Sequence, residues 1–420
     1  MGFTISPAEA KQHSRAFAIY RTEATAKNLT SDDVVELISK YGGEKSKSPS
    51  SFDEFTKAVS KAPTHPDAEG SGDCLGFAAK DKSGHLAPMR FERRAVGPKD
   101  VAFAITHCGV CHSDLHQIKN DWGGSTFPMV PGHELVGIVT EVGAEVTKVK
   151  VGDRAAVGCM VDSCRSCDAC QQDLEQFCDN VTWTYNSTGK DGRATQGGYS
   201  THTVTDEKFI VKFPDTLDLA AGAPLLCAGI TTYSPLRHWG LDKPGTKLGV
   251  VGLGGLGHMA VKFGKAFGAE VTVISTSPAK EKEALEEFGA DHFVVSSSEE
   301  DMKRHATTLD GIIDTVSAKH DLNQYLSLLK LNGALVMVGL PNMPLPIAAG
   351  SLIFKRRTLG GSAIGSIKET QEMIDFCAEK QITCKIELID INYINEAMER
   401  LEKNDVKYRF VIDVAGSLVV

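Results

Sequence analysis

The hydrophobic pattern changes character partway along the chain. From Gly76, short runs of apolar or β-branched residues alternate with polar turn residues, as in Phe91–Arg94, Val101–Thr106 and Val136–Val142. Gly-Pro, Pro-Gly and Gly-Asp pairs separate these runs, which is typical of β-strands joined by tight turns. This part of the sequence therefore predicts a β-rich unit.

From about Ala228, strand patterns and helix patterns alternate. We expect these elements, in order, over Lys247–Val251, Leu256–Phe267, Glu270–Ser275 and Ala279–Phe288, with a later buried strand over Leu335–Val338. A strand, a helix and a second strand in this order form the unit of a doubly wound parallel sheet. The chain is thus expected to be an α/β protein that combines such a sheet with the β-rich unit.

Residues 1–72 follow neither pattern. The stretch 45–51 is rich in Ser and Lys, 62–72 is rich in Pro, Asp and Gly, and two short helical patterns begin near Thr30 and Phe52. We expect a weakly ordered N-terminal extension, with a docking or regulatory arm as the alternative. Its many acidic residues argue against a plastid transit peptide.

Composition and charge then exclude several classes of protein. The chain has 420 residues, of which 42% are hydrophobic and 24% are charged, close to the globular average. Its net charge of −9 gives no overall basic surface for nucleic acid or anionic membranes. No apolar run is long enough to span a bilayer, and the first ten residues lack a secretory signal. We therefore expect a cytoplasmic protein.

A glycine-rich loop joins the first strand of the second region to its helix. The loop carries the pattern G-x-G-x-x-G, formed by Gly252, Leu253, Gly254, Gly255, Leu256 and Gly257. Between a strand and a helix, this pattern favours a dinucleotide, whose pyrophosphate binds at the helix N-terminus. The alternative is a purely structural turn.

The end of the next strand indicates which dinucleotide is preferred. NAD-specific sites place an Asp or Glu there to bind the ribose 2′-hydroxyl. This chain instead has Ser275, Thr276 and Ser277, followed by Lys280. Hydroxyls and an ammonium suit a 2′-phosphate, which a carboxylate would repel. The sequence therefore predicts a preference for NADP(H).

Eleven cysteines without an export signal point to metal ligands or buried thiols rather than disulfides. Four of them lie within fifteen residues, at Cys164, Cys167, Cys170 and Cys178. Four thiolates in one loop suit a closed, structural zinc site. A nucleic-acid-binding zinc module is the rival interpretation, but the acidic side chains around the loop argue against it.

Three further potential ligands, Cys111, His133 and Cys227, are scattered along the chain. Their spacing alone does not indicate a site, because isolated Cys and His residues are usually core or surface residues. Two of them lie in unusual settings, however. Cys111 begins the polar run 111–116, and His133 follows a Pro-Gly turn and precedes Glu134.

With these motifs, the chain resembles the zinc-containing medium-chain alcohol dehydrogenases, and among them the plant cinnamyl alcohol dehydrogenase family. The matching segments are 109–116, 131–134, the four-cysteine lobe, 224–229, the glycine loop and 409–411. The resemblance covers about residues 72–416 and implies a Rossmann-type domain with a GroES-like catalytic domain. It implies the catalytic domain (73–227, with a zinc lobe at 159–180, and 366–420) and the NADP-binding domain (228–365), whereas the extension (1–72) is not part of the family pattern.

The resemblance also implies roles for single residues. Cys111, His133 and Cys227 match the ligands of the catalytic zinc, a set known from alcohol dehydrogenases, and Glu134 matches a carboxylate that can join them. Ser113 matches the hydroxyl that accepts the alcohol proton, and His116 matches the residue that passes this proton to solvent.

Further contacts to the cofactor follow from the same resemblance. The matching positions are Ser113, Thr231, Thr315, Gly339, Ser362, Ala363 and Ile364, together with the glycine loop, Ser275, Thr276, Ser277 and Lys280. The resemblance thus implies NADP(H), two zinc ions per chain, a small-molecule substrate and a homodimer.

The substrate pocket is expected at positions Trp122, Cys159, Trp183 and Ala363. Lignin-forming members of the family carry a bulky aromatic side chain where this chain has Ala363, so we expect a wider pocket. The implied activity interconverts allylic or aromatic primary alcohols, of cinnamyl or terpenoid type, and their aldehydes in plant specialised metabolism. The alternatives are an NADPH-dependent reductase of an iminium or conjugated enal, and a non-catalytic protein that binds NADPH and zinc.

Overall fold

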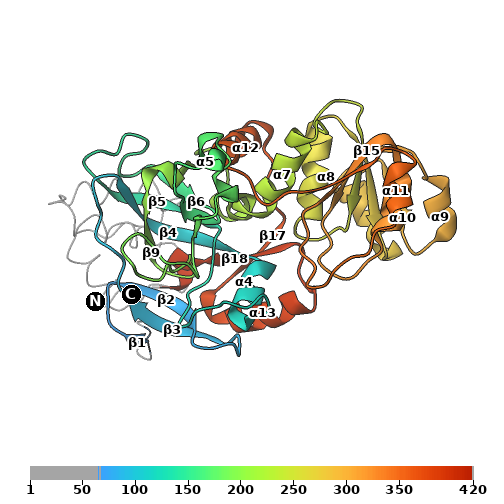
Figure 1. Ribbon diagram of the computed structural model, residues 1–420. Coiled ribbons are helices and arrows are strands. Elements are labelled where there is room, and N and C mark those ends of the chain that lie inside the picture. The colour runs from blue at the N-terminus through green and yellow to red at the C-terminus, as the bar shows by residue number, and fades with distance from the viewer. Residues whose placement is uncertain (1–64, 66–67, 419–420) are drawn as a thin grey trace, which may run out of the picture. The chain divides into compact units, whose positions relative to one another are not determined.

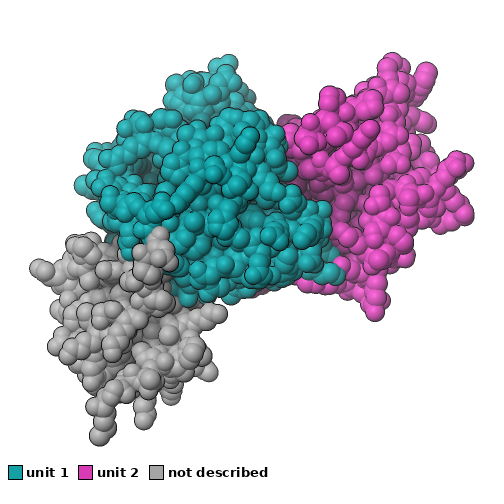
Figure 2. Space-filling view, turned by 90° about the horizontal axis from the view of Figure 1, so that it is seen from below, with its two compact units in different colours: residues 1–226, 386–420 teal, residues 227–385 magenta. Residues whose placement is uncertain are grey.

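The computed structural model describes residues 65 and 68–418, and these form two compact units (Figure 2). The described residues of unit 1 are 65, 68–226 and 386–418, and unit 2 comprises residues 227–385. The helical patterns expected within the first 64 residues lie outside the described residues. None of the described helices is by itself long and apolar enough to cross a membrane, although one bent pair, Leu219–Leu226 with Ala228–His238, meets the criteria by length and composition.

A seven-stranded sheet forms the centre of unit 1 (Figure 1). Its order is β10-β6-β5-β4-β18-β17, and β9 also pairs with β4. The strands are β4 (Asp100–Val110), β5 (Leu135–Val142), β6 (Arg154–Val157), β9 (His202–Asp206), β10 (Val211–Lys212), β17 (Ile386–Ile389) and β18 (Arg409–Asp413). All residues of β4 are buried, so this strand supplies the core on both of its faces.

Two smaller sheets and several short helices complete unit 1. The sheets are formed by β1 (Glu69–Gly70), β3 (Leu86–Phe91) and β2 (Cys74–Ala79), and by β7 (Met160–Asp162) and β8 (Thr182–Trp183). The α-helices are α4 (His112–Lys119), α5 (Asp168–Gln171), α6 (Leu219–Gly222), α13 (Ile394–Glu402) and α14 (Val414–Ser417). The 3₁₀ turns are η1 (Glu175–Phe177), η2 (Glu207–Phe209), η3 (Ala223–Leu226) and η6 (Ile391–Tyr393).

Unit 2 contains a six-stranded parallel sheet in the order β13-β12-β11-β14-β15-β16. The strands are β11 (Lys247–Val251), β12 (Glu270–Ser275), β13 (His292–Val295), β14 (Leu309–Asp314), β15 (Leu329–Met337) and β16 (Thr358–Gly361). This is the doubly wound order of dinucleotide-binding domains, in which the sequence direction reverses between β11 and β14. The predicted α/β fold is therefore present.

Helices lie on both sides of this sheet, with α7 and α8 on one side and α10 and α11 on the other (Figure 1). The helices are α7 (Ala228–His238), α8 (Gly257–Ala266), α9 (Glu299–Arg304), α10 (Leu322–Leu328), α11 (Ala349–Ile353) and α12 (Ile367–Lys380). The expected helix over 279–288 is present as a continuous helical segment, with 3₁₀ geometry in η4 (Pro278–Lys280), α-helical geometry at residues 281–282 and π geometry in η5 (Glu283–Glu287).

The boundary of unit 2 differs from the one predicted at residue 365. Helix α12 packs against α7, where Tyr233 donates a hydrogen bond to Glu372 (2.9 Å) and Ser234 donates one to Glu369 (3.1 Å). These contacts place α12 in unit 2, which extends to Lys385. The return to unit 1 begins only with β17.

Candidate active site

Four potential metal ligands form one cluster. The ligand atoms of Cys111, His133, Glu134 and Cys227 all lie within 4.8 Å of one another. Cys111 lies between β4 and α4, where its backbone N–H donates to Asp114 (2.9 Å) and completes a capping box. Cys227 directly follows η3, at the point where the chain leaves unit 1.

Asp114 connects these segments through hydrogen bonds. It is fully buried and accepts hydrogen bonds from the His133 Nδ1 (3.1 Å), the Gly132 N–H (3.0 Å) and the Tyr199 hydroxyl (3.1 Å). The bond to Nδ1 fixes the imidazole so that Nε2 is left for a ligand bond. Burial lowers the pKa of His133, but the Asp114 carboxylate and the neighbouring Cys159 and Cys111 together raise it overall. A bound cation would reverse this balance.

Glu134 has one satisfied and one unsatisfied carboxylate oxygen. Its Oε1 forms an ion pair with Arg409, which also donates to the Val110 carbonyl (2.9 Å). Its Oε2 is buried and has no hydrogen-bond partner among the described residues. Burial raises the pKa of the Glu134 carboxyl to about 7, although Arg409 opposes the shift. A side chain at Gly109 would come within 1.8 Å of Oε2, so a glycine there leaves the carboxylate its space.

These observations show that the residues fit a zinc ion. A buried carboxylate oxygen without a donor is costly, and a divalent cation would satisfy it. Two thiols, an imidazole and a carboxylate form the mixed sulfur, nitrogen and oxygen set that zinc binds. With three of them as ligands, a fourth position would stay open for a substrate.

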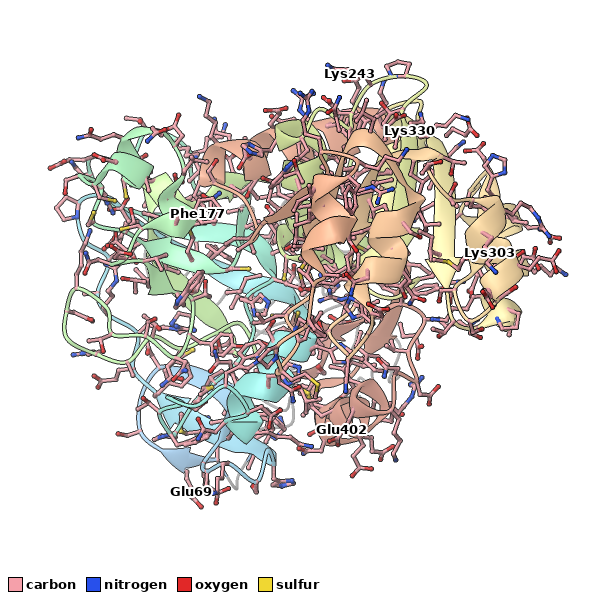
Figure 3. All side chains as sticks on the ribbon, turned by 45° about the vertical axis from the view of Figure 1, so that its right-hand side comes forward. Glu69, Phe177, Lys243, Lys303, Lys330 and Glu402 are labelled. Carbon is pink, nitrogen blue, oxygen red and sulfur yellow. The ribbon has the colours of Figure 1, made fainter. Side chains whose placement is uncertain are left out.

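Ser113 and His116 lie one turn apart on α4 and so share a face of that helix. The Ser113 Oγ accepts a hydrogen bond from the Cys111 thiol (3.6 Å). The His116 Nδ1 lies 2.8 Å from Asp121, and its side chain is 30% exposed. Helix α4 is held at its end by an ion pair of Lys119 with Glu402 of α13 (2.6 Å; Figure 3 labels Glu402).

The four-cysteine lobe lies between β7 and β8. The sulfur atoms of its cysteines are within 4.8 Å of one another. The Cys164 sulfur accepts a hydrogen bond from the backbone N–H of Cys167 (3.3 Å), and hydrogen bonds from Ser166 and Cys167 lower the pKa of the Cys164 thiol to about 6. The lobe also presents Phe177, which is 52% exposed (Figure 3). Four sulfur ligands with no open position fit a structural zinc.

The glycine loop of unit 2 begins directly after β11 and ends at the first residue of α8. A side chain at Gly257 would come within 2.0 Å of the Gly252 carbonyl, so only a glycine allows the helix to start this close to the loop. A side chain at Gly254 would meet nothing within 4 Å. The loop is therefore tightly packed at its two ends and open in its middle, as binding of a pyrophosphate requires.

The residues expected at the 2′-phosphate lie beside this loop. The Lys280 Nζ donates to the Leu253 carbonyl (2.8 Å), which brings the ammonium group to the loop. Ser275 ends β12, and its Oγ accepts the N–H of Ser277 (3.2 Å), while Thr276 is exposed. The arrangement places hydroxyls and one cation together, with no carboxylate among them.

The loop after β14 is held by a histidine that the sequence analysis did not single out. The His320 Nε2 binds the buried Asp314 carboxylate (2.7 Å), and its Nδ1 lies 2.8 Å from the Ala318 carbonyl. The hydrogen bond to Asp314 raises the pKa of His320. Thr315 lies between Asp314 and His320 in the sequence. Its Oγ1 donates to the Val251 carbonyl (2.7 Å) and so connects this loop to β11, the strand before the glycine loop.

The other expected cofactor positions also belong to unit 2. A side chain at Gly339 would lie 2.5 Å from the Val316 carbonyl. Thr231 is buried in α7. The segment that follows β16 comprises Ser362, Ala363 and Ile364, and the Ser362 N–H donates to Met337 (3.0 Å). Glycine-loop and strand-end residues therefore gather at the carboxyl ends of the strands.

The expected substrate residues are divided between the units. Trp122 and Trp183 of unit 1 are 38% and 40% exposed, and Trp122 packs beside the His116 ring with centroids 4.9 Å apart. The Cys159 sulfur lies 3.9 Å from the Leu226 carbonyl. Ala363 belongs to unit 2 and is exposed.

Sequence reasoning missed the residues that hold the ligands in place. Asp114 was noticed only as part of a polar run, and Tyr185, whose ring stacks on His133 with centroids 5.8 Å apart, was not noticed at all. A signal existed for Asp114, because an acid three residues after Cys111 can cap the helix that starts there. No comparable signal exists for Tyr185 or Tyr199.

Comparison with known proteins gives matches in both units. The family model "Alcohol dehydrogenase GroES-like domain" matches residues 97–215, and "Zinc-binding dehydrogenase" matches residues 255–379. The 8-hydroxygeraniol dehydrogenase of Catharanthus roseus is 59% identical over 84% of this chain and 98% of its own length. The vomilenine reductase of Rauvolfia serpentina is 58% identical over the same shares.

Solved structures agree with these matches. A cinnamyl alcohol dehydrogenase of Sorghum bicolor is 51% identical, with a TM-score of 0.80 over 82% of this chain and 99% of that one. A cinnamyl alcohol dehydrogenase of Helicobacter pylori, solved in complex with NADP(H), is 42% identical, with a TM-score of 0.77 over the same shares.

The four-cysteine lobe gives a first testable prediction. Replacing Cys164 with Ser should remove one zinc per chain and lower the melting temperature by roughly 5 °C or more, because the metal closes the loop. Metal analysis and thermal unfolding measure both effects. The control is Cys159→Ser, which should retain full zinc content. Unchanged zinc content in Cys164→Ser would contradict a zinc site in the lobe.

Proposed function

The chain belongs to the cinnamyl-alcohol-dehydrogenase-like family of zinc-containing medium-chain alcohol dehydrogenases, as its motifs predicted, and from this membership we propose that it interconverts allylic or aromatic primary alcohols and their aldehydes. The enzyme is an NADP-dependent zinc alcohol dehydrogenase. The proposal concerns the substrate class, the residues that perform the reaction and the number of metal ions. It rests most directly on the cluster of Cys111, His133, Glu134 and Cys227.

The proposed catalytic metal site consists of Cys111, His133 and Cys227, with Glu134 beside them. When bound, zinc supplies a Lewis acid for the substrate oxygen, and NADP⁺ supplies the acceptor for a hydride. Asp114 orients the imidazole through Nδ1, and Arg409 holds one oxygen of Glu134. The four-cysteine lobe takes the second of two zinc ions per chain.

The protein's own residues provide the path of the proton. Ser113 accepts the proton of the substrate hydroxyl at its Oγ, next to the Cys111 sulfur. His116, one turn further along α4 and 30% exposed, takes the proton to solvent. Asp121 holds the Nδ1 of this imidazole at 2.8 Å, so that its ring keeps one orientation during the transfer.

The proposed NADP(H) site lies in unit 2. The glycine loop and the N-terminus of α8 hold the pyrophosphate, and Ser275, Thr276 and Lys280 hold the 2′-phosphate. The preference for NADP(H) is supported by the absence of an acid from the end of β12 and by the structural relative that contains NADP(H).

The substrate class is proposed from two kinds of support. Aromatic walls at Trp122 and Trp183 suit planar, conjugated substrates. The small Ala363 leaves room for bulkier terpenoid chains, and the similar protein from Catharanthus roseus is named for such an alcohol. We place the activity in plant specialised metabolism on the same grounds.

A second candidate function is the reduction of an iminium or conjugated enal by NADPH. It is favoured by one observation, the 58% identity with vomilenine reductase. Against it, the chain retains Ser113 and His116, which a reductase of C=N or C=C bonds does not need for an alcohol proton. The two functions separate in an assay that offers both kinds of substrate.

We further propose a homodimer in the cytoplasm. Strand β16 ends the sheet of unit 2, and three exposed apolar side chains lie on neighbouring elements, Leu331 (64%), Ile353 (69%) and Phe354 (86%). An open strand edge beside apolar surface favours self-association. Among the described residues, no disulfide joins any of the eleven cysteines, which suits a reducing compartment, and imaging of a tagged chain in plant cells tests the location.

The catalytic zinc site is tested by Cys111→Ala and Cys227→Ala. Each variant should lose at least about a thousandfold in kcat, because the ligands of the Lewis acid are gone, while the NADPH dissociation constant stays unchanged. Stopped assays of turnover measure kcat, and fluorescence titration measures the NADPH dissociation constant. Cys377→Ala, a buried cysteine outside both clusters, is the matched control. A ligand variant with normal turnover would refute the metal site.

The substrate class is tested with a panel of cinnamyl, terpenoid and iminium compounds. Ala363→Phe should shift the ratio of kcat/KM from bulky terpenoid alcohols toward planar aromatic ones by about tenfold, because the new ring fills the pocket. Ala144→Phe, at an exposed position of unit 1, should leave this ratio unchanged. An unaltered ratio in Ala363→Phe would show that this position does not set specificity.

The homodimer is tested by light scattering after size exclusion. The unaltered chain should elute with twice its mass of 45.1 kDa. Phe354→Asp should shift the protein to the monomer, because a charge would be buried in the interface. Phe177→Ser, at an exposed apolar position in unit 1, should remain dimeric. A dimeric Phe354→Asp protein would place the interface elsewhere.

A further inference from the structure

Helix α8, which follows the glycine loop, carries a buried histidine that the proposed reaction does not use. His258 is the second residue of this helix and is 0% exposed. Its Nδ1 lies 3.0 Å from the Gly254 carbonyl oxygen, inside the glycine loop. Its Nε2 lies 3.3 Å from the backbone nitrogen of Lys385. The ring therefore bridges two segments that are far apart in the sequence.

The two partners determine the protonation state of His258. A carbonyl oxygen can only accept a hydrogen bond, so the Nδ1 must carry the proton that it donates to Gly254. A backbone N–H can only donate, so the Nε2 must be unprotonated to accept from Lys385. In these two hydrogen bonds the imidazole is therefore neutral, with Nδ1 as the donor and Nε2 as the acceptor.

The bond to the Gly254 carbonyl also fixes the orientation of the Gly255 N–H, which points in the opposite direction. The Gly254 carbonyl belongs to the same planar peptide unit as the N–H of Gly255, and in a trans peptide these two groups point in opposite directions. The Gly254 carbonyl also accepts the backbone N–H of His258 (3.1 Å), so it points into the first turn of α8. The Gly255 N–H therefore points out of the helix N-terminus, toward the position that an anion takes.

The second partner lies at the end of unit 2. Lys385 is the last residue of this unit, after which the chain enters β17 of unit 1. One turn after His258 on the same helix, the Lys262 Nζ donates to the Thr383 carbonyl (2.6 Å). Helix α8 thus contacts the segment 383–385 through His258 and Lys262, and His258 also contacts the glycine loop.

We propose that His258 is a positioning residue for NADP(H). Its ring directs the Gly255 N–H toward the pyrophosphate, and it also couples binding of the cofactor at the glycine loop to the backbone of the segment 383–385. This inference rests on the proposed NADP(H) site and extends it. A ligand that reduces the mobility of the loop also holds the Gly254 carbonyl more firmly against the His258 ring. The ring in turn holds the backbone N–H of Lys385 more firmly. The segment at the exit of unit 2 therefore responds to the cofactor.

Three substitutions at His258 separate the two bonds. In His258→Asn the amide nitrogen takes the place of Nδ1 and still donates to Gly254, but it does not reach Lys385. In His258→Gln the longer side chain brings its carbonyl oxygen to the place of Nε2 and loses the bond to Gly254. His258→Leu has a similar volume and makes neither bond.

Binding of NADPH is measured first, by fluorescence titration of the full-length protein. His258→Leu and His258→Gln should raise the dissociation constant about threefold to tenfold, the usual effect of one lost hydrogen bond, and His258→Asn should stay within about twofold of the unaltered protein. The KM for NADPH should rise in parallel while kcat at saturation stays unchanged. Lys262→Met, which loosens the segment 383–385 without touching the loop, should bind NADPH normally.

Hydrogen exchange of a peptide that contains Lys385 is measured second. NADPH should slow this exchange in the unaltered protein, but not in His258→Asn, His258→Gln or His258→Leu, because each variant lacks at least one of the two bonds of the path. Normal NADPH binding by His258→Leu, or equally weak binding by His258→Asn and His258→Leu, would overturn the positioning role. NADPH-slowed exchange in His258→Asn would overturn the transmission. Failure of the unaltered protein to bind NADPH would overturn both this inference and the proposed cofactor site.

Discussion

A single buried carboxylate, Asp114, constrains the segments of unit 1 that carry Cys111 and His133. Asp114 has no access to water, so its charge must be compensated by donors from the protein. These donors come from three separate stretches, namely the N-terminus of α4, the turn at 132–133 and Tyr199. Because each stretch must present its donor to the same two oxygen atoms, their relative positions are fixed before any metal binds. The ligands are thereby preorganised.

Much of the fold could be predicted because it is encoded locally. The strands over Lys247–Val251 and Glu270–Ser275 were placed without error, since each is a short apolar run bounded by turn residues. The strand expected over 91–94 in fact ends at Phe91, because Arg93 turns aside to donate to backbone carbonyls, including that of Gln196. Helix α12 was assigned to the wrong unit for a related reason. Its contacts with α7 lie more than a hundred residues away in the sequence.

In the candidate site, too, features encoded by neighbouring residues could be predicted, whereas contacts between residues far apart in the sequence could not. The four-cysteine cluster is visible in the sequence because its members are closely spaced, whereas the scattered residues Cys111, His133 and Cys227 could be grouped only through the family resemblance. The groups that support them are invisible there, because Tyr199 is 85 residues from Asp114 and Arg409 is 275 residues from Glu134. Physical chemistry predicts that buried charges have partners, but only the folded chain reveals which ones they are.

The interrupted course of unit 1 has a consequence for how the protein is made. Its central strand β4 needs β18 as a neighbour, and β18 includes Arg409, yet all of unit 2 is translated between them. Unit 2 is continuous and can fold as soon as it has been synthesised, whereas unit 1 cannot pair β4 with β18, or Glu134 with Arg409, until the segment after unit 2 has also been made. A chain truncated before β18 would therefore contain a complete unit 2 joined to an unfinished unit 1, a natural target for cellular quality control.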